Sequence, residues 1–132
     1  MSHSLALRVY YEDTDFSGAV YHASYLRFME RARTEMLRAA GIHQQEIFDG
    51  KHGAPFGFAV RAMRIDFLKP ARMDDALSIE THVLAIRGAS LELEQKVLRE
   101  GEALVVAQVT IACIANGRAA RLPAWVKEKI AR

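Results

Sequence analysis

The segment from about His22 to Ala40 constrains the fold most strongly, because it carries a single apolar stripe that has to be buried. Apolar residues recur there at spacings of three and four, the period of an amphipathic α-helix, at Tyr25, Met29, Ala32, Met36 and Ala40, flanked by Leu26, Phe28 and Leu37. Gly41 follows, as is usual just past a helix end. The outer face is charged, and we expect pairs such as Arg31 with Glu35, one turn apart, on a solvated surface.

Strand patterns occupy most of the remaining chain. Alternation of apolar and polar residues predicts a first strand over residues 5–12, and after the loop "DGKHGAPFG" it predicts further strands over 58–68, 77–83, 91–97 and 103–115. Within 58–68 the apolar residues of the alternation stand at even-numbered positions up to Ala62 and at odd-numbered positions from Met63 onward. Such a switch would turn them to the opposite face of the strand, which suggests a β-bulge. The segment 103–115 is apolar at nearly every position, so we expect it near the sheet centre, covered on both faces.

The connections between these strands are short, which predicts antiparallel neighbours; they read "KPARMDD", "RGA", "REGE" and "NG". The C-terminal "LPAWVKEKIAR" places Pro123 at a plausible first helical position and fits a short helix or an extension of the sheet. The order predicts an α+β fold, an antiparallel sheet of five or so strands with one long helix laid across one face. Because one helix covers only one face, association of two copies is expected to cover the rest.

Length and composition narrow the class of function. With 132 residues the chain is expected to form one domain, residues 1–132. Its 18 basic and 16 acidic residues give a net charge of +2 without a basic block, which argues against a nucleic-acid partner. No apolar run approaches the roughly 20 residues of a membrane span, and no leader pattern is visible, so a cytoplasmic location is expected.

Metal and thiol chemistry find little support in the sequence. Cys113 is the only cysteine and lies in the apolar run "VVAQVTIACIA", which predicts a buried, unreactive thiol. The five histidines are scattered without the spacing of zinc ligands. A carboxylate-held ion at Asp13 and Asp15 is the remaining alternative, and we expect no metal and no cofactor.

Three acidic residues crowd the connection "EDTDFSG" between the first strand and the helix: Glu12, Asp13 and Asp15. Loops at such junctions often present functional groups. The unpaired N–H groups of a helix start carry about half a positive charge, which stabilises a carboxylate and polarises a carbonyl oxygen. Taken singly, Asp13 and Asp15 also fit turn or capping roles, and His22 fits a buried polar residue. Two aspartates, a glycine turn and a histidine within ten positions favour a functional site.

The run "VYYEDTDFSGAVYHASYLRFMERARTEMLR" resembles the signature of the 4-hydroxybenzoyl-CoA thioesterase-like branch of hotdog-fold proteins, and within it the Tol-Pal system-associated acyl-CoA thioesterases. The stretches "MRIDFLKPARMDDALSIET" and "RGASL" are similar to the same family, so the resemblance covers about residues 7–126. It implies a hotdog fold, in which an antiparallel sheet wraps a central helix. It also implies a homodimer joined sheet edge to edge, often paired again as a homotetramer, with the active site at the subunit interface.

The resemblance further implies an acyl-CoA thioesterase that hydrolyses an acyl-CoA thioester to a free carboxylic acid and CoA. Asp15 would attack the thioester or activate a water, and the backbone amide of His22 would polarise the carbonyl. Asp13 would order the turn, and Tyr11 and Tyr21 would shape the acyl pocket. The larger Phe16 in the turn before Gly18 departs from the family's commonest form and would narrow that pocket.

For the CoA end, the resemblance implies contacts from Arg87 and Ser90 in "IRGAS", with Lys69 and Arg72 as further candidates. The alternative function is a hotdog acyl-CoA-binding or scaffold component of a cell-envelope-associated complex with little hydrolysis. A hotdog hydratase would carry its aspartate and histidine elsewhere in the sheet.

Overall fold

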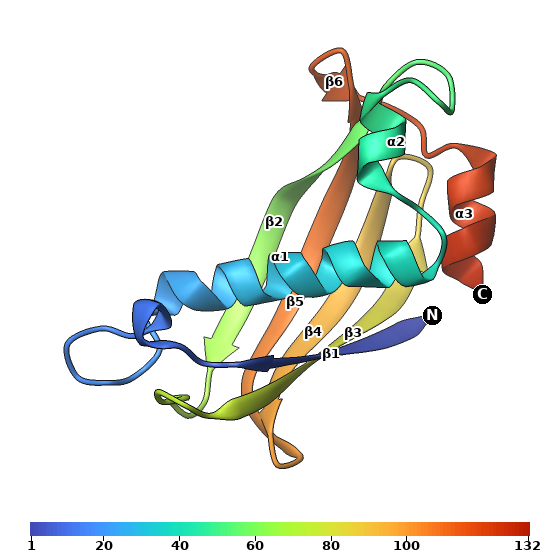
Figure 1. The fold of residues 1–132 in the computed structure, drawn as a ribbon. Helices are drawn as coiled ribbons and strands as arrows, with labels where there is room; N and C mark the ends of the chain where they lie inside the picture. Colours follow the sequence, from blue (N-terminus) through green and yellow to red (C-terminus); the bar gives the residue numbers. More distant parts are fainter.

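The computed structural model describes residues 1–132 and contains a six-stranded antiparallel sheet with the order β1-β3-β4-β5-β2, to which β6 adds beside β5. Figure 1 shows this sheet curling around one long helix, α1, which crosses the strands. The strands are β1 (Ser2–Arg8), β2 (Gly57–Phe67), β3 (Ala76–Ile86), β4 (Ser90–Arg99), β5 (Glu102–Ala115) and β6 (Arg118–Ala119). The helices are α1 (His22–Ala39), α2 (Gln44–Phe48), α3 (Ala124–Ala131) and the 3-10 turn η1 (Tyr11–Asp13). The expected α+β arrangement is confirmed.

The apolar stripe of α1 forms the centre of the core, as its spacing predicts. Its buried members pack into one cluster of 25 apolar residues with the facing strands; they are Tyr25, Phe28, Met29, Ala32, Met36 and Leu37. Gly41 lies just beyond the helix with a φ of +83°, a conformation that glycine adopts without a steric penalty. The helix therefore begins and ends within a residue of the expected positions.

The charged face of α1 pairs differently from the expectation. Glu35 contacts Arg38 at 3.4 Å, and no ion pair joins it to Arg31. Arg31 lies four residues before Glu35 and Arg38 lies three residues after it, so both are neighbours of Glu35 on the helix surface. The exposed glutamate can therefore pair with either arginine at little difference in free energy. Because both side chains are largely exposed, the pair contributes little to stability.

The first strand ends four residues earlier than expected. β1 stops at Arg8, and the chain turns into η1 instead of continuing to Glu12. The carboxylate of Asp13 accepts the Tyr10 N–H at 2.8 Å, and such a local side-chain bond competes with strand pairing. As a consequence Tyr11, which lies within the expected strand 5–12, is instead part of η1 and is 81% exposed.

The connection "KPARMDD" does not join neighbouring strands, contrary to the expectation. β2 pairs only with β5, whereas β3 lies between β1 and β4. The chain thus passes from one edge of the sheet to its interior between residues 68 and 75. This segment bonds to the loop before α1 instead of closing a hairpin, through Val20 N–H to Ala71 O (2.9 Å) and Met73 N–H to Gly18 O (3.1 Å). The other short turns do join antiparallel neighbours.

β5 lies next to the central strand, near the sheet centre as expected, but within one chain it is not covered on both faces. β4 holds the middle of the path, and the face of β5 directed away from α1 exposes Gln108 and half-exposes Val106 and Thr110. The outer face of the sheet is therefore open in the single chain. Cys113 is buried as expected, and its burial raises the pKa of the thiol.

Two further predictions of local structure concern the bulge in β2 and the C-terminal segment. The expected bulge in β2 is confirmed, because the register against β5 shifts between Val60 and Ala62. The C-terminal segment is a helix, α3, with Pro123 one position before it. The five-residue α2 carries too short a pattern to be read from the sequence. No helix combines the length and apolar character needed to cross a membrane.

The buried hydroxyl of Tyr25 ties α1 to the segment between β2 and β3, and it can be tested by stability. It accepts the N–H of Ala71, a fully buried residue, at 3.0 Å. We expect Tyr25→Phe to lower the free energy of unfolding in urea by about 1–3 kcal/mol, because the substitution leaves a buried N–H without a partner. Tyr10→Phe, which alters a tyrosine that is 60% exposed, is the control and should change it by less than about 0.5 kcal/mol. Equal effects of the two variants would contradict this role of Tyr25.

Candidate active site

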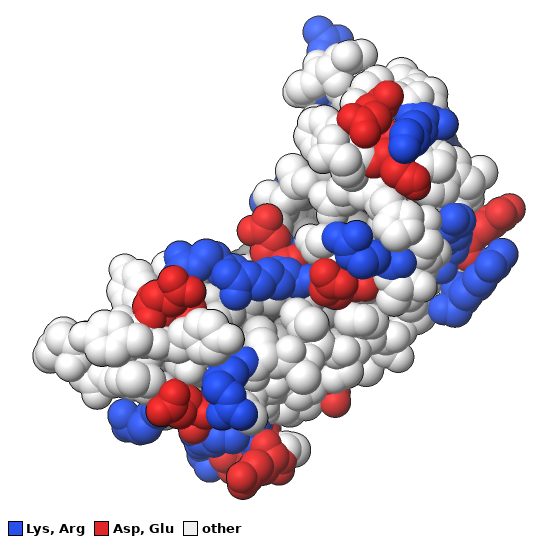
Figure 2. All heavy atoms as spheres, in the orientation of Figure 1, with Lys and Arg blue, Asp and Glu red and all other residues white.

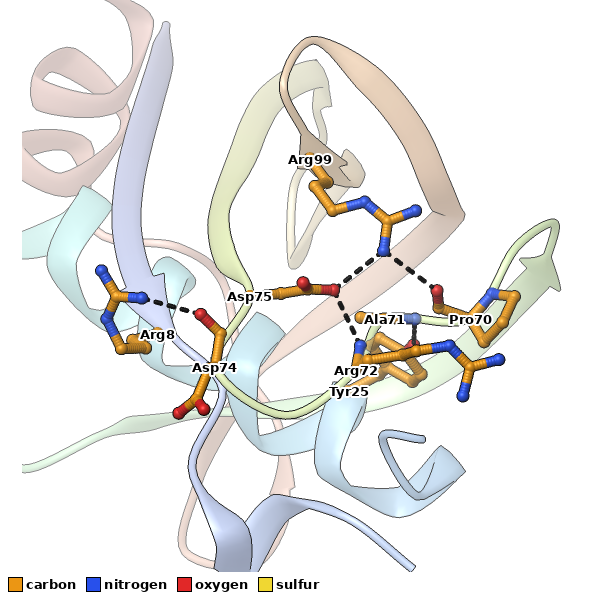
Figure 3. Close-up of polar contacts among 8 residues, drawn as sticks. All are labelled: Arg8, Tyr25, Pro70, Ala71, Arg72, Asp74, Asp75 and Arg99. Atoms are coloured by element: carbon orange, nitrogen blue, oxygen red, sulfur yellow. Dashed lines mark hydrogen bonds and ion pairs between the residues drawn. The ribbon is translucent and has the colours of Figure 1, made fainter. Parts of the chain in front are cut away.

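A network of polar contacts holds the segment between β2 and β3 against the start of α1 (Figure 3). The carboxylate of Asp75 accepts the Arg72 N–H and an N–H of Arg99, each at 2.8 Å. Arg99 also donates to the carbonyl of Pro70 at 3.3 Å. Burial opposes ionisation of Asp75, but its hydrogen bonds from Arg72 and Arg99 outweigh burial and lower its pKa. The segment is thus fixed from one side by an ion pair and from the other by Tyr25.

This fixed segment supports the loop that carries Asp15. Besides the bonds from Val20 and Met73, the loop closes on itself through Asp15 N–H to Ala19 O (2.9 Å) and Gly18 N–H to Asp15 O (3.1 Å). Gly18 adopts a φ of +82°, which this tight turn requires. The Asp15 backbone is therefore held at both ends of the turn, and its side chain is exposed.

Hydrogen bonds within the turn stabilise the ionised form of Asp15. Its Oδ1 accepts the hydroxyl of Ser17 at 2.5 Å and the backbone N–H of Ser17 at 2.8 Å. These two bonds, the hydroxyl first, lower the pKa of Asp15, and the nearby His22 adds a smaller contribution in the same direction. The site thus presents a carboxylate, not a carboxylic acid, at neutral pH.

The start of α1 faces the same site. The helix begins at His22 without a side-chain cap, and the N–H of His22 donates to no acceptor within the chain. Free N–H groups at a helix start attract negative charge, so a carbonyl oxygen placed there would be polarised. Asp13 lies just behind, buried, with its carbonyl accepting the N–H of Tyr21 at 2.9 Å.

Asp15 and His22 line one open hollow of about 230 Å³. Its other walls are aromatic and aliphatic, with the ring of Phe67 at 4.6 Å from that of His22 and 5.7 Å from that of Tyr25. Leu68 and Lys69 complete the rim next to Phe67. Asp15, the first residue of α1 and an apolar wall therefore border one hollow, which suits attack on a carbonyl carbon attached to an apolar group.

The other residues proposed from the sequence divide into two groups. Lys69 lines the hollow and pairs with Glu102 at 2.8 Å, and Arg72 has an exposed side chain on the same segment. Tyr21 is 57% exposed at the helix start and points an aromatic ring next to His22, with ring centroids 6.5 Å apart. Of these three residues, only Lys69 lines the hollow together with Asp15, whereas Arg72 and Tyr21 lie outside its lining on neighbouring segments.

Arg87 and Ser90 lie elsewhere in the chain. They flank the turn between β3 and β4, where the carbonyl of Gly88 accepts the N–H of Leu122 near the C-terminus. The site lies at the other end of β4, beside Arg99, so roughly 30 Å separate the two ends of this strand. Arg87 pairs with Glu92 at 3.1 Å, and Ser90 is buried. The single chain does not bring them together with Asp15.

Residues outside the predicted set also shape the site. Phe67 and Tyr25 form its apolar wall, and Asp75 with Arg99 fixes its back. Tyr25 and Phe67 read as ordinary core positions in the sequence, and Asp75 and Arg99 stand 24 positions apart, so no local pattern singles them out. No three His, Cys, Asp or Glu side chains lie close enough together to hold a metal ion.

The state of Asp15 can be measured without any substrate. We expect its pKa, from the pH dependence of its ¹³C carboxyl shift, to lie below the usual value for aspartate, because hydrogen bonds from Ser17 favour the charged form. Ser17→Ala should raise this pKa by removing the hydroxyl bond. Ser4→Ala, which removes an exposed hydroxyl far from the site, should leave it unchanged. An Asp15 pKa that does not respond to Ser17→Ala would show that this bond is unimportant in solution.

Comparison with known proteins agrees with this arrangement. A family model described as the thioesterase-like superfamily matches residues 9–130. The acyl-CoA thioesterase YbgC of Haemophilus influenzae is 44% identical over 87% of this chain and 82% of its own. The acyl-CoA thioester hydrolase YbgC of Escherichia coli O6:H1 is 45% identical over 82% of this chain and 78% of its own.

The fold also superimposes closely on solved structures. A probable thioesterase from Bartonella henselae superimposes with a TM-score of 0.89 at 44% identity, covering 93% of this chain and all of that one. The chain therefore belongs to the thioesterase-like superfamily, and its curled sheet around α1 is the hotdog fold.

Proposed function

We propose that this chain is an acyl-CoA thioester hydrolase that releases a free carboxylic acid and CoA, with Asp15 as the reactive carboxylate. The observation that carries the proposal is the shared hollow, which is lined by both Asp15 and His22, the first residue of α1. The thioesterase names of relatives at 44% and 45% identity support the same reaction. No cofactor is required for it.

Two routes use these groups. In the first, an Asp15 oxygen attacks the thioester carbon and expels the CoA thiolate, and water then hydrolyses the resulting anhydride. In the second, Asp15 removes a proton from a water whose oxygen attacks the carbon, and the C–S bond then breaks to release CoA, whose sulfur regains a proton. In both, the negative charge that develops on the carbonyl oxygen is stabilised by the His22 N–H. Both routes need the ionised form of Asp15, which the hydrogen bonds from Ser17 favour by lowering its pKa.

We propose that a second copy completes the site in a homodimer, which in turn pairs as a homotetramer. The loop around Asp15 exposes large aromatic rings, fully at Phe16 and mostly at Tyr11. In Figure 2 the outermost tip at the left is white, and charged side chains border it. β2 is a free sheet edge that also exposes Val60 and Phe67. An unpaired edge with apolar side chains favours pairing with another strand, and a partner would shield the hollow from water.

The proposed CoA contacts follow from where the basic residues lie. Lys69 and Arg72 stand beside the hollow and are our candidates for the phosphates of CoA bound in the same chain. Arg87 and Ser90 lie too far along the sheet, so we assign them to CoA only from a partner subunit. Tyr21 is proposed to border the acyl group at the helix start.

The resemblance to Tol-Pal system-associated thioesterases extends the proposal to the setting of the enzyme. We propose a single catalytic domain, residues 1–132, that acts in the cytoplasm and is associated with that envelope system.

Turnover of acyl-CoA by Asp15→Asn tests the reaction directly. With a panel of aliphatic and aromatic acyl-CoA substrates at equal concentrations of folded protein, we expect kcat/KM to fall about 10²–10⁴-fold, since the amide is a poor base and nucleophile. Asp49→Asn, an exposed aspartate on the distant α2 end, should retain wild-type activity. If Asp15→Asn stays within a few fold of wild type, the catalytic assignment is wrong. Absence of turnover by wild type on every substrate would favour the binding or scaffold alternative.

The proposed assembly can be checked by the mass in solution. Light scattering coupled to gel filtration should give two or four times the mass of one chain, because the exposed β2 edge and the aromatic loop are then buried. A mass equal to one chain across the working concentration range would rule out a site at a subunit interface.

A further inference from the structure

Three basic side chains lie on the segment between β2 and β3 and on the adjoining end of β4, and two of them are already paired with acids. Arg99 contacts Asp75 at 2.8 Å, and Lys69 contacts Glu102 at 2.8 Å. Arg72 takes part in none of the seven ion pairs of the chain. A negatively charged ligand that reaches this corner of the molecule therefore meets two cations whose charges are neutralised by neighbouring carboxylates.

The pair of Asp75 and Arg99 is built into the fold (Figure 3). Its side chains are only 23% and 30% exposed, in that order. The same carboxylate oxygen of Asp75 also accepts the N–H of Arg72, and Arg99 also donates to the carbonyl of Pro70. Removing one partner would leave a partly buried charge uncompensated, which is costly. Arg99 is therefore a fixed part of the scaffold and cannot readily change its partner.

The pair of Lys69 and Glu102 is held loosely by comparison. Its side chains are 56% and 51% exposed, and the bond from Nζ to Oε2 is the only side-chain hydrogen bond that either residue makes. This bond lowers the pKa of Glu102, so its carboxylate is ionised at neutral pH. An exposed ion pair of this kind contributes little to stability, so Lys69 can leave Glu102 at small cost. Lys69 lines the hollow at Asp15, whereas Glu102 lies outside its lining.

We propose that Lys69 exchanges partners, from Glu102 in the free protein to a phosphate of CoA in the bound state, so that Glu102 sets how tightly CoA is held. The inference rests on the proposed function, in which Lys69 contacts these phosphates. A phosphate monoester carries about 1.5–2 negative charges at neutral pH, against one for a carboxylate, and the three rotatable donors of an ammonium group suit either acceptor.

Glu102 is thus a positioning residue, because it acts through Lys69 and not on the ligand. The acyl-CoA substrate and the released CoA carry the same phosphates, so the competition from Glu102 weakens the binding of both. Its consequence is faster release of the CoA product at the expense of substrate affinity.

Dissociation constants of CoA and of pantetheine, which has the thiol arm of CoA without its phosphates, test this exchange by titration calorimetry. We expect Glu102→Gln to tighten CoA binding about two- to fivefold, because Lys69 is then unpaired in the free protein, and to leave pantetheine binding unchanged. Glu100→Gln is the matched control, since it removes the same charge from an exposed residue of the same turn that does not pair with Lys69. At about 0.15 M salt, which screens distant charges, it should leave CoA binding within about 1.5-fold of wild type.

A double variant shows whether Glu102 acts through Lys69. Lys69→Met alone should weaken CoA binding at least about twofold, and adding Glu102→Gln to it should change nothing further, because the carboxylate then has no cation to hold. A gain in affinity that persists in the double variant, or equal effects of Glu102→Gln and Glu100→Gln, would overturn the exchange.

Two other results would overturn it as well. One is unchanged CoA binding in Glu102→Gln, and the other is a wild type that binds CoA no more tightly than pantetheine. Because these titrations involve no turnover, the exchange can fail while the proposed hydrolysis stands. Loss of the hydrolysis would appear instead in the turnover of wild type and Asp15→Asn.

Discussion

The anchoring of the segment between β2 and β3 is the constraint on which the site depends. This segment has to pass from the free edge of the sheet to its interior beneath the start of α1, and it is held there by the Tyr25 hydroxyl and by the Asp75–Arg99 ion pair. Its backbone in turn bonds to Gly18 and Val20, on the C-terminal arm of the Asp15 turn. The position of the reactive carboxylate is therefore set by the core and by the sheet, although the carboxylate itself is exposed.

Two hollows beside α1 follow from the way this helix packs. Its apolar stripe packs on a curled sheet, and hollows remain at both ends of the contact. The hollow beside Met36 and Leu37 lies against the β2 edge, which we expect a second copy to cover. The hollow at the helix start is lined by Asp15 and by Lys69, the cation that Glu102 holds. The proposed reactive carboxylate and the cation proposed to exchange partners therefore share one end of the helix.

Local patterns in the sequence predict the elements well but not their pairing. The stripe of α1, the bulge in β2 and the burial of Cys113 depend on nearby residues, and each was predicted correctly. The neighbours of β2 were not, because strand order is decided by contacts that no turn sequence encodes. The same reason hides Tyr25 as a partner of Ala71, 46 positions away. Arg87 and Ser90 were grouped with Asp15 by resemblance, and distance along β4 separates them in the chain.

The central claim is that an Asp15 carboxylate, kept ionised by Ser17, carries out the reaction. The most direct test is the pH dependence of kcat/KM for wild type and Ser17→Ala with one acyl-CoA substrate. A reaction that needs the ionised form loses rate as the pH falls through the pKa of that group, so the acid limb of wild type should lie below the usual aspartate range. Removing the Ser17 hydroxyl should move this limb to higher pH. An acid limb near neutral pH, or one that Ser17→Ala leaves in place, would mean that another group controls the reaction.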